Sequence, residues 1–149
     1  MTERRRLRAV FDTNIFVAAY LSKNPNSPTV ELLTRWRQGE LELLYSDDLL
    51  VEIDEKFSAR GISDEHKVGL LIELRDWAAY VDVKSWDAKP VILADPDDDY
   101  ILACAVAGGA DYLVSYDTDF DVLDGEYHGI KIVKALPFLW AVRGDRPPA

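Results

Sequence analysis

The sequence predicts an α/β fold with a mostly parallel central sheet of four or five strands. Two observations predict it. Short apolar segments, partly β-branched, alternate with longer segments of helical periodicity along the chain, and helix-capping or turn-forming residues separate one segment from the next. Such alternation is typical of parallel strands covered by helices on both faces, with ligands bound beyond the carboxyl ends of the strands. We therefore expect a three-layer α/β/α sandwich.

Five segments have the length and composition of buried strands. The first ends at Asp12, where the sequence Asp-Thr-Asn is typical of a helix N-cap, so a helix is expected to follow directly. The fourth ends shortly before Asp117. The expected strands cover residues 7–11, 41–45, 80–83, 112–115 and 130–133.

Helices are expected between these strands, and several of their ends carry recognisable signals. Pro96 suits a first helical position, and Gly39 and the pair Gly108-Gly109 suit helix ends. The expected helices cover about residues 15–21, 30–38, 46–57, 64–77, 96–107 and 138–142. One domain over residues 1–142 contains all of these elements, and residues 143–149, which include two consecutive prolines, are expected to be a disordered tail.

Composition favours a single domain in a reducing compartment. A chain of 149 residues can bury one hydrophobic core without disulfides. The single cysteine, Cys104, lies in an apolar run, where a lone buried thiol forms neither an intramolecular disulfide nor a zinc site. No apolar stretch approaches the ~18–20 residues of a membrane span, and no targeting signal is visible. We expect a cytoplasmic protein with no membrane association.

The formal net charge of −10 argues at first against nucleic-acid binding, because domains that bind phosphate usually carry a basic surface. The distribution weakens this objection, since many acids are concentrated in residues 95–99 and 117–126. A metal site could use some of these acids while the arginines of residues 4–8, Arg35 and Arg37 contact phosphate. Solubility alone explains the total charge equally well.

Four acidic side chains could converge at one edge of the expected sheet. Asp12 and Asp117 each follow the end of an expected strand. Asp98 lies in the first turn of one helix, and Glu52 lies in the first half of another. Four carboxylates about 6 Å apart would repel by roughly 3 kcal/mol per pair at an effective dielectric constant near 20. Protonation or a divalent cation would relieve this repulsion, and an all-oxygen site suits Mg²⁺ or Mn²⁺, which can activate water against a phosphodiester.

Each acid also has a purely structural explanation. Asp12 could simply cap the helix that follows it, and Asp97 and Asp99 could complement the dipole of theirs. Helical periodicity does not favour Glu52 over Glu55.

Other reactive or aromatic side chains do not suggest a different chemistry. His66 and His128 have no serine or cysteine partner at a recognisable spacing, so we expect both at the surface and no hydrolase triad. The four tryptophans are expected to pack in the core or between helices rather than to stack on bases: Trp36, Trp77, Trp86 and Trp140.

Four segments, in order and spacing, resemble the PIN-domain family, most closely the VapC-like toxin components of bacterial toxin–antitoxin systems. The resemblance extends from about residue 7 to residue 139. The segments are Val10-Phe11-Asp12-Thr13-Asn14-Ile15-Phe16, Ser46 with Glu52-Ile53, Asp95-Pro96-Asp97-Asp98-Asp99-Tyr100-Ile101-Leu102-Ala103, and Ala110-Asp111-Tyr112-Leu113-Val114-Ser115-Tyr116-Asp117-Thr118-Asp119-Phe120.

The resemblance implies a PIN-like fold and a Mg²⁺- or Mn²⁺-dependent endoribonuclease. The family's acids fall onto Asp12, Glu52, Asp98 and Asp117. The three aspartates are expected to hold the metal. Glu52 is expected to hold a second ion or to orient the attacking water. An RNA substrate, a cognate antitoxin protein bound near the acidic groove and a homodimer are further expectations from the resemblance.

Three neighbouring residues would modify this site. The resemblance implies that Asn14 braces the loop of Asp12 and that Asp119 is a supporting fifth acid. Tyr116 departs from the family's pattern, which more often has a small or basic residue there, and it could crowd the cleft and tune activity.

Two other functions fit parts of the pattern. A PIN-like binding module without activity would keep the fold and the partner surface. A phosphoaspartyl switch or phosphatase also places an aspartate after its first strand, but the dehalogenase-like pattern requires a second aspartate where Asn14 stands. A receiver domain requires its acceptor aspartate after the third strand, not the first.

Overall fold

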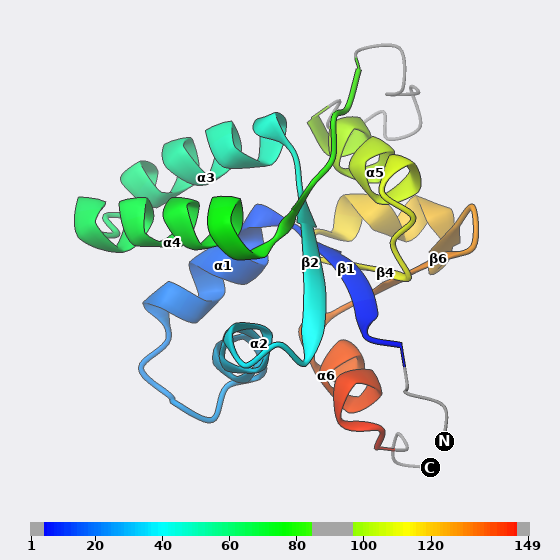
Figure 1. The fold of residues 1–149 in the computed structure, drawn as a ribbon, viewed down its shortest axis with the longest axis horizontal. Helices are drawn as coiled ribbons and strands as arrows, with labels where there is room; N and C mark the ends of the chain where they lie inside the picture. Colours follow the sequence, from blue (N-terminus) through cyan, green and yellow to red (C-terminus); the bar gives the residue numbers. More distant parts are fainter. Residues whose placement is uncertain (1–4, 85–96, 146–149) are drawn as a thin grey trace.

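A six-stranded sheet forms the centre of the computed structural model, which describes residues 5–84 and 97–145 (Figure 1). The strand order is β3-β2-β1-β4-β6-β5, and every neighbouring pair is parallel except β5 and β6. The strands are β1 (Leu7–Phe11), β2 (Leu41–Tyr45), β3 (Ala79–Tyr80), β4 (Tyr112–Val114), β5 (Glu126–Tyr127) and β6 (Ile130–Val133). The predicted α/β class and mostly parallel sheet are confirmed.

The sheet has one strand more than predicted. Strand β5 pairs with β6 across a tight turn in which His128 and Gly129 both have positive φ. Two residues are too few to show a periodicity of two, so the sequence gives no signal for β5. Strand β3 also lies slightly earlier than expected and ends at Tyr80.

Side chains alternate between the two faces of the sheet, as the pleat of a β-strand requires. In β1, Ala9 and Phe11 belong to one buried cluster, whereas Val10 belongs to the other. In β4, Val114 belongs to the first of these clusters and Leu113 to the second. Both faces of the central strands are therefore buried, which explains their nearly continuous apolar sequences.

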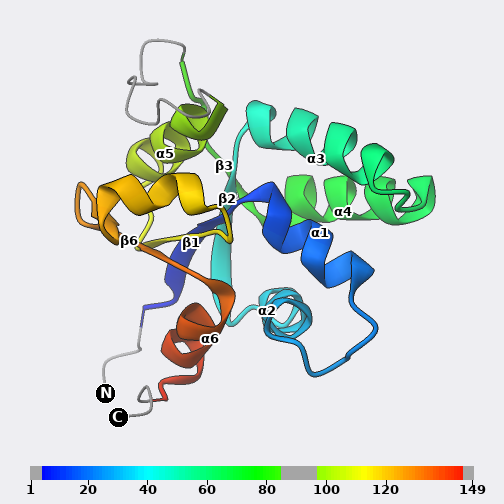
Figure 2. The ribbon, with the colours of Figure 1, turned by 180° about the vertical axis from the view of Figure 1, so that it is seen from behind.

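Helices cover both faces (Figures 1 and 2). Residues of five helices contribute to the first cluster: α1 (Thr13–Leu21), α2 (Pro28–Arg37), α3 (Asp47–Ala59), α4 (Asp64–Trp77) and α6 (Ala135–Arg143). Helix α5 (Asp97–Ala107) and the 3₁₀ helix η2 (Thr118–Leu123) contribute to the second. The three-layer arrangement is thus confirmed.

Helix ends agree with the capping signals where the structure describes them. Ser46 caps α3 by accepting a hydrogen bond from the backbone N–H of Leu49. The expected helix start at Asp95-Pro96 lies outside the described residues. Helix α6 begins at residue 135, earlier than expected, because a proline is tolerated in the first turn of a helix.

Helix α6 also extends further than the expected domain. Its last residue is Arg143, one position beyond the expected boundary at 142, and Arg143 forms an ion pair with Glu31 of α2. The division into a domain of residues 1–142 and a disordered tail of residues 143–149 otherwise stays a prediction, and residues 146–149 lie outside the described part.

Several expectations about single side chains can be checked directly. Cys104 is buried, and burial raises the pKa of its thiol to about 12, so it is not reactive at neutral pH. His66 and His128 are exposed as expected. Trp36 is buried, and Trp77 at the end of α4 packs against the Trp36 ring of α2, although Trp77 is 60% exposed. Trp86 lies outside the described residues.

No helix within the described residues is both long and apolar enough to span a membrane.

Candidate active site

The two strand-end aspartates are brought together by the pairing of β1 with β4. These strands are parallel neighbours, with Phe11 opposite Val114. The ladder continues one step past β1, where the backbone N–H of Asp12 donates a 2.9 Å hydrogen bond to the carbonyl of Val114. The residues that follow the two strands therefore emerge at the same edge of the sheet, as predicted.

Asp12 is 3% exposed, and protein groups surround its carboxylate. Oδ1 accepts a 2.8 Å hydrogen bond from the backbone N–H of Thr13, which makes Asp12 the N-cap of α1. Oδ2 accepts hydrogen bonds from the Ser115 hydroxyl at 2.7 Å and from Nδ2 of Asn14 at 3.2 Å. The structural role of Asp12 as a helix cap is thus real, but it uses only one of the two oxygens.

Burial raises the pKa of the Asp12 carboxyl above its usual range. The hydrogen bonds from Ser115 and Thr13 oppose this shift, the negative charge of Asp117 adds to it, and the positive charge of Lys56 lowers it again. Asp12 is therefore a carboxylate whose ionised form is destabilised by its surroundings, which a nearby cation would reverse.

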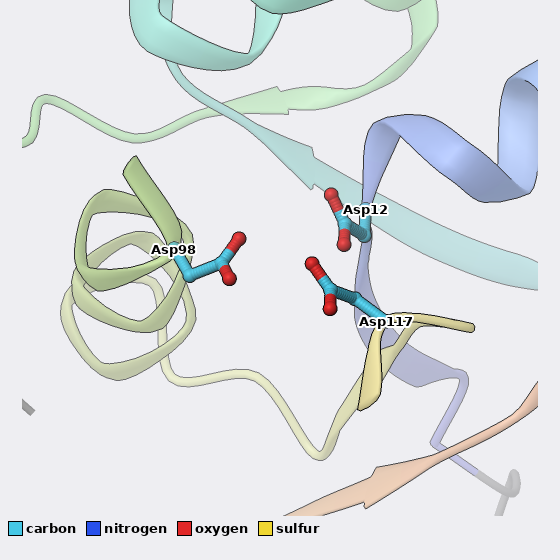
Figure 3. Close-up of side chains that lie close together, drawn as sticks. All are labelled: Asp12, Asp98 and Asp117. Carbon is cyan, nitrogen blue, oxygen red and sulfur yellow. The ribbon is translucent and has the colours of Figure 1, made fainter. Parts of the chain in front are cut away.

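Asp117 and Asp98 complete a compact group of carboxylates with Asp12. Asp117 caps η2 by accepting a 2.9 Å hydrogen bond from the backbone N–H of Asp119, and Asp98 is 4% exposed in the first turn of α5. One oxygen of each of Asp12, Asp98 and Asp117 lies within 4.8 Å of the others. Figure 3 shows the three side chains pointing toward one another from three separate elements.

Glu52 lies at the same pocket but outside this compact group. The pocket has a volume of about 340 Å³, and its lining includes all four predicted acids. Glu52 reaches it from α3 and also lines a neighbouring pocket with Glu55, whereas Glu55 does not line the first one. The four acids are thus found around one cavity, three of them in mutual contact range.

The neighbouring polar residues hold the two loops of the site together. Asn14 donates to Asp12 through Nδ2 and accepts a 3.1 Å hydrogen bond from the backbone N–H of Tyr116 through Oδ1. This is the bracing contact expected of Asn14. The Tyr116 side chain is 39% exposed and does not line the pocket of the aspartates, so the structure gives no sign that it crowds the cleft. Asp119 donates its backbone N–H to Oδ1 of Asp117, and its role as a supporting fifth acid stays a prediction.

The three aspartates fit a divalent cation. Two carboxylates 4.8 Å apart repel by roughly 3 kcal/mol at an effective dielectric constant near 20, and the cluster contains three such pairs. An all-carboxylate donor set in an open pocket suits a hard cation of the Mg²⁺ or Mn²⁺ kind, which keeps several water ligands. Asp12, Asp98 and Asp117 are the residues that could hold it.

Basic residues near this pocket are not those that the sequence suggested. Of the expected arginines, Arg35 and Arg37 pair with glutamates at 2.7 and 2.6 Å, Arg5 pairs with Asp111, and none of them lines the pocket. Residues Lys56 and Arg60 of α3 and its C-cap do line it. Their spacing from Glu52 could have indicated them in the sequence. They follow Glu52 by four and eight residues, and residues at this spacing share one face of a helix.

Comparison with known proteins agrees with this geometry. Residues 8–119 match the family model of the PIN domain. No curated protein matches the sequence. Among solved structures, VapBC2 from Rickettsia felis, bound to a DNA fragment from its promoter, has a TM-score of 0.56 and 17% identity, covering 85% of this chain and 97% of that chain.

A second similar structure is FitAcB from Neisseria gonorrhoeae, with a TM-score of 0.53 and 18% identity, covering 86% of this chain and 98% of that chain. At these identities the two structures support the fold, while the family model matches most of the sequence directly, over a range that contains all four acids. The chain belongs to the PIN domain family.

Proposed function

We propose that this protein is a metal-dependent endoribonuclease. The observation that carries the proposal is the convergence of Asp12, Asp98 and Asp117 within 4.8 Å in a pocket of about 340 Å³. Members of the PIN domain family are nucleases, and the acids that the resemblance assigns to the active site are the ones that line this pocket.

In this proposal the three aspartates hold Mg²⁺ or Mn²⁺, which when bound supplies Lewis-acid stabilisation of the phosphodiester and an activated water. Ser115 and Asn14 fix the orientation of the Asp12 carboxylate through their hydrogen bonds. Glu52, which lines the same pocket from α3, holds a second ion or accepts a proton from the attacking water and orients it.

A cleavage assay on single-stranded RNA tests the proposal. Wild-type protein should cleave with Mg²⁺ or Mn²⁺, stop when the metal is chelated and recover on metal add-back. Asp12→Asn and Asp98→Asn should each lose at least about 100-fold in rate, since each removes a charged ligand. Full metal-dependent activity in either variant would refute the assignment of these residues, whereas wild-type protein without any cleavage activity would favour a binding module.

Matched controls separate the site from general effects of charge. Glu52→Gln should impair cleavage, whereas Glu55→Gln, which removes a carboxylate from the same helix but outside the pocket of the aspartates, should not. Asp121→Asn, an exposed position in η2, provides the corresponding control for the aspartates.

We further propose that the nuclease is the toxin component of a toxin–antitoxin system and acts in the cytoplasm. The support is that the two similar structures are the complexes VapBC2 and FitAcB, of which the first is bound to promoter DNA. A cognate antitoxin and a homodimer are then the expected partners. Expression of the wild type should arrest growth, Asp98→Asn should not, and co-expression with the product of an adjacent gene should restore growth and yield a stable complex.

A further inference from the structure

The pocket of the aspartates has a second, positively charged part along helix α3. Lys56 and Arg60 line this part, together with Val17 and Ala59. Relative to Glu52, they lie about one and two helical turns further along α3, or about 6 and 12 Å along its axis. The lining of one cavity therefore changes from carboxylates to cationic groups along a single helix.

Lys56 and Arg60 stand apart from the ion pairs that the described residues form. Within the described residues neither side chain forms a salt bridge, although most arginines of the structure do, Arg37 with Glu73 at 2.6 Å for example. Both side chains are exposed, so they can reorient toward a ligand. Lys56 is also close enough to Asp12 to influence its ionisation.

The balance of charge in the pocket indicates what this ligand must be. Four carboxylates and one divalent ion leave a formal charge of −2 in the pocket before its two cationic side chains are counted. A polyanion with several phosphates then still needs positive charge next to the scissile position, because the chain as a whole carries −10. Lys56 and Arg60 are the residues in the pocket that supply it.

We propose that Lys56 and Arg60 bind phosphates of a single-stranded RNA on one side of the scissile phosphate, so that the strand runs along α3 from the aspartates toward Arg60. The proposal rests on the proposed ribonuclease function and names two residues that position its substrate. Contacts to phosphate carry no sequence information, so these two residues set affinity and register rather than base preference.

Two structural roles could also explain a lysine and an arginine at these positions. Cations near the C-terminus of a helix interact favourably with its dipole, and α3 ends at Ala59 with Arg60 as its C-cap. Lys56 could also only reduce the repulsion among the aspartates. Either role predicts a change in the stability or metal affinity of the protein and no change in KM for RNA.

The test measures kcat and KM for a short single-stranded RNA at several salt concentrations with Mn²⁺ present. Lys56→Met and Arg60→Met keep much of the side-chain volume and remove the charge. We expect KM to rise about two- to fivefold in each variant and about tenfold in the double variant, with kcat within about twofold. The slope of log KM against log salt should fall by about 0.7 for each lost phosphate contact.

Controls distinguish this result from other outcomes. Lys23→Met removes an exposed lysine outside the pocket and should leave KM unchanged, whereas Lys56→Arg should retain most of the wild-type affinity. If KM and its salt dependence are unchanged in the double variant while cleavage still requires Asp98, the phosphate-binding role is refuted and the nuclease function stands. Wild-type protein that neither cleaves nor binds this RNA in the presence of metal contradicts both.

Discussion

The hydroxyl of Ser115 joins the two strand-end aspartates of the site, because it donates a 2.7 Å hydrogen bond to Oδ2 of Asp12 and accepts a 2.9 Å hydrogen bond from the backbone N–H of Asp117. The pairing of β1 with β4 brings the two loops together, and this 5% exposed hydroxyl fixes their relative orientation. Partners of this kind set the geometry of metal-ligating carboxylates.

Ser115→Ala should therefore lower nuclease activity by about 10- to 100-fold, the usual effect of removing a group that orients a metal ligand. The partly buried N–H of Asp117 would lose its acceptor, at a cost of about 1–2 kcal/mol in the free energy of unfolding. Ser115→Thr keeps the hydroxyl and should retain most activity. Equal activity of the alanine and threonine variants in metal-dependent cleavage would show that the hydroxyl is dispensable.

Metal binding should stabilise the fold. A ligand that binds only the folded state at 100 times its Kd adds about 2.7 kcal/mol to the free energy of unfolding, which corresponds to roughly 5–10 °C in Tm for a chain of this size. Mn²⁺ titration in a thermal unfolding experiment should show this shift for the wild type and for Glu55→Gln. Asp98→Asn should show little of it, and an undiminished shift would place the metal elsewhere.

The raised pKa of Asp12 predicts how the metal-free protein responds to pH. A carboxyl with a higher pKa in the folded than in the unfolded state favours folding fully at low pH, and this contribution is lost as pH rises from about 3.8 through the folded-state pKa. Asp12→Asn removes the effect, so in chelator the variant should exceed the wild type in Tm by more at pH 8 than at pH 4.

With excess Mn²⁺ at pH 8, the Tm of the wild type should exceed that of Asp12→Asn, because only the wild-type carboxylate is stabilised by the cation. Thermal unfolding of both proteins at the two pH values, with chelator and with metal, checks the prediction. A Tm difference that is independent of pH would contradict it.

The path of the chain was largely predictable from sequence because it depends on local patterns. The apolar strand before Asp12 and the capping serine at residue 46 each carry their signal within a few positions, and the structure confirms both. Strand β5 could not be predicted, because its two residues acquire strand geometry only by pairing with β6. The exposure of Trp77 depends likewise on where α4 ends beside β3.

The site was predictable to a smaller extent. Sequence order placed Asp12 and Asp117 at strand ends, but the register that sets Phe11 opposite Val114 comes only from the folded sheet. Periodicity could not separate Glu52 from Glu55, since the angle of α3 over the sheet decides which of them faces the pocket. Lys56 and Arg60 could not be predicted from composition, because the arginines of this chain are most concentrated near its N-terminus, away from the pocket.

Glu31 should link helices α2 and α6 in a pH-dependent way. Its carboxylate binds Arg143 of α6 and Arg35 of α2, and the hydrogen bonds from these two residues, that from Arg143 above all, hold its pKa below the usual range. Glu31→Gln should cost about 1 kcal/mol of stability at pH 7, as partly exposed ion-pair networks do.

The stabilising effect of Glu31 is present above the unfolded-state pKa of about 4.5 and is lost as pH falls through the lower folded-state pKa. The difference between wild type and Glu31→Gln in urea unfolding should therefore shrink below about pH 4. Glu40→Gln, which removes only a pair with Arg35, should have a smaller effect at pH 7, and equal effects of the two variants would show that the contact with Arg143 contributes nothing.

Two glycines should respond in opposite directions to replacement by alanine. A Cβ on Gly108, at the end of α5, would lie 2.8 Å from side-chain atoms of both Leu44 and Val81 and 3.0 Å from the carbonyl oxygen of Cys104. These atoms belong to the core and to a helix end that cannot move aside easily, so Gly108→Ala should destabilise by about 1–3 kcal/mol.

Gly69 lies within α4, where an added Cβ meets nothing within 4 Å. Gly69→Ala should stabilise by about 0.5–1 kcal/mol, because alanine loses less conformational entropy in a helix. Urea unfolding of the two variants measures both effects, and since neither position lies at the pocket of the aspartates, both proteins should keep wild-type cleavage rates while folded. A neutral or stabilising Gly108→Ala would mean that α5 packs less closely on β2 than the structure shows.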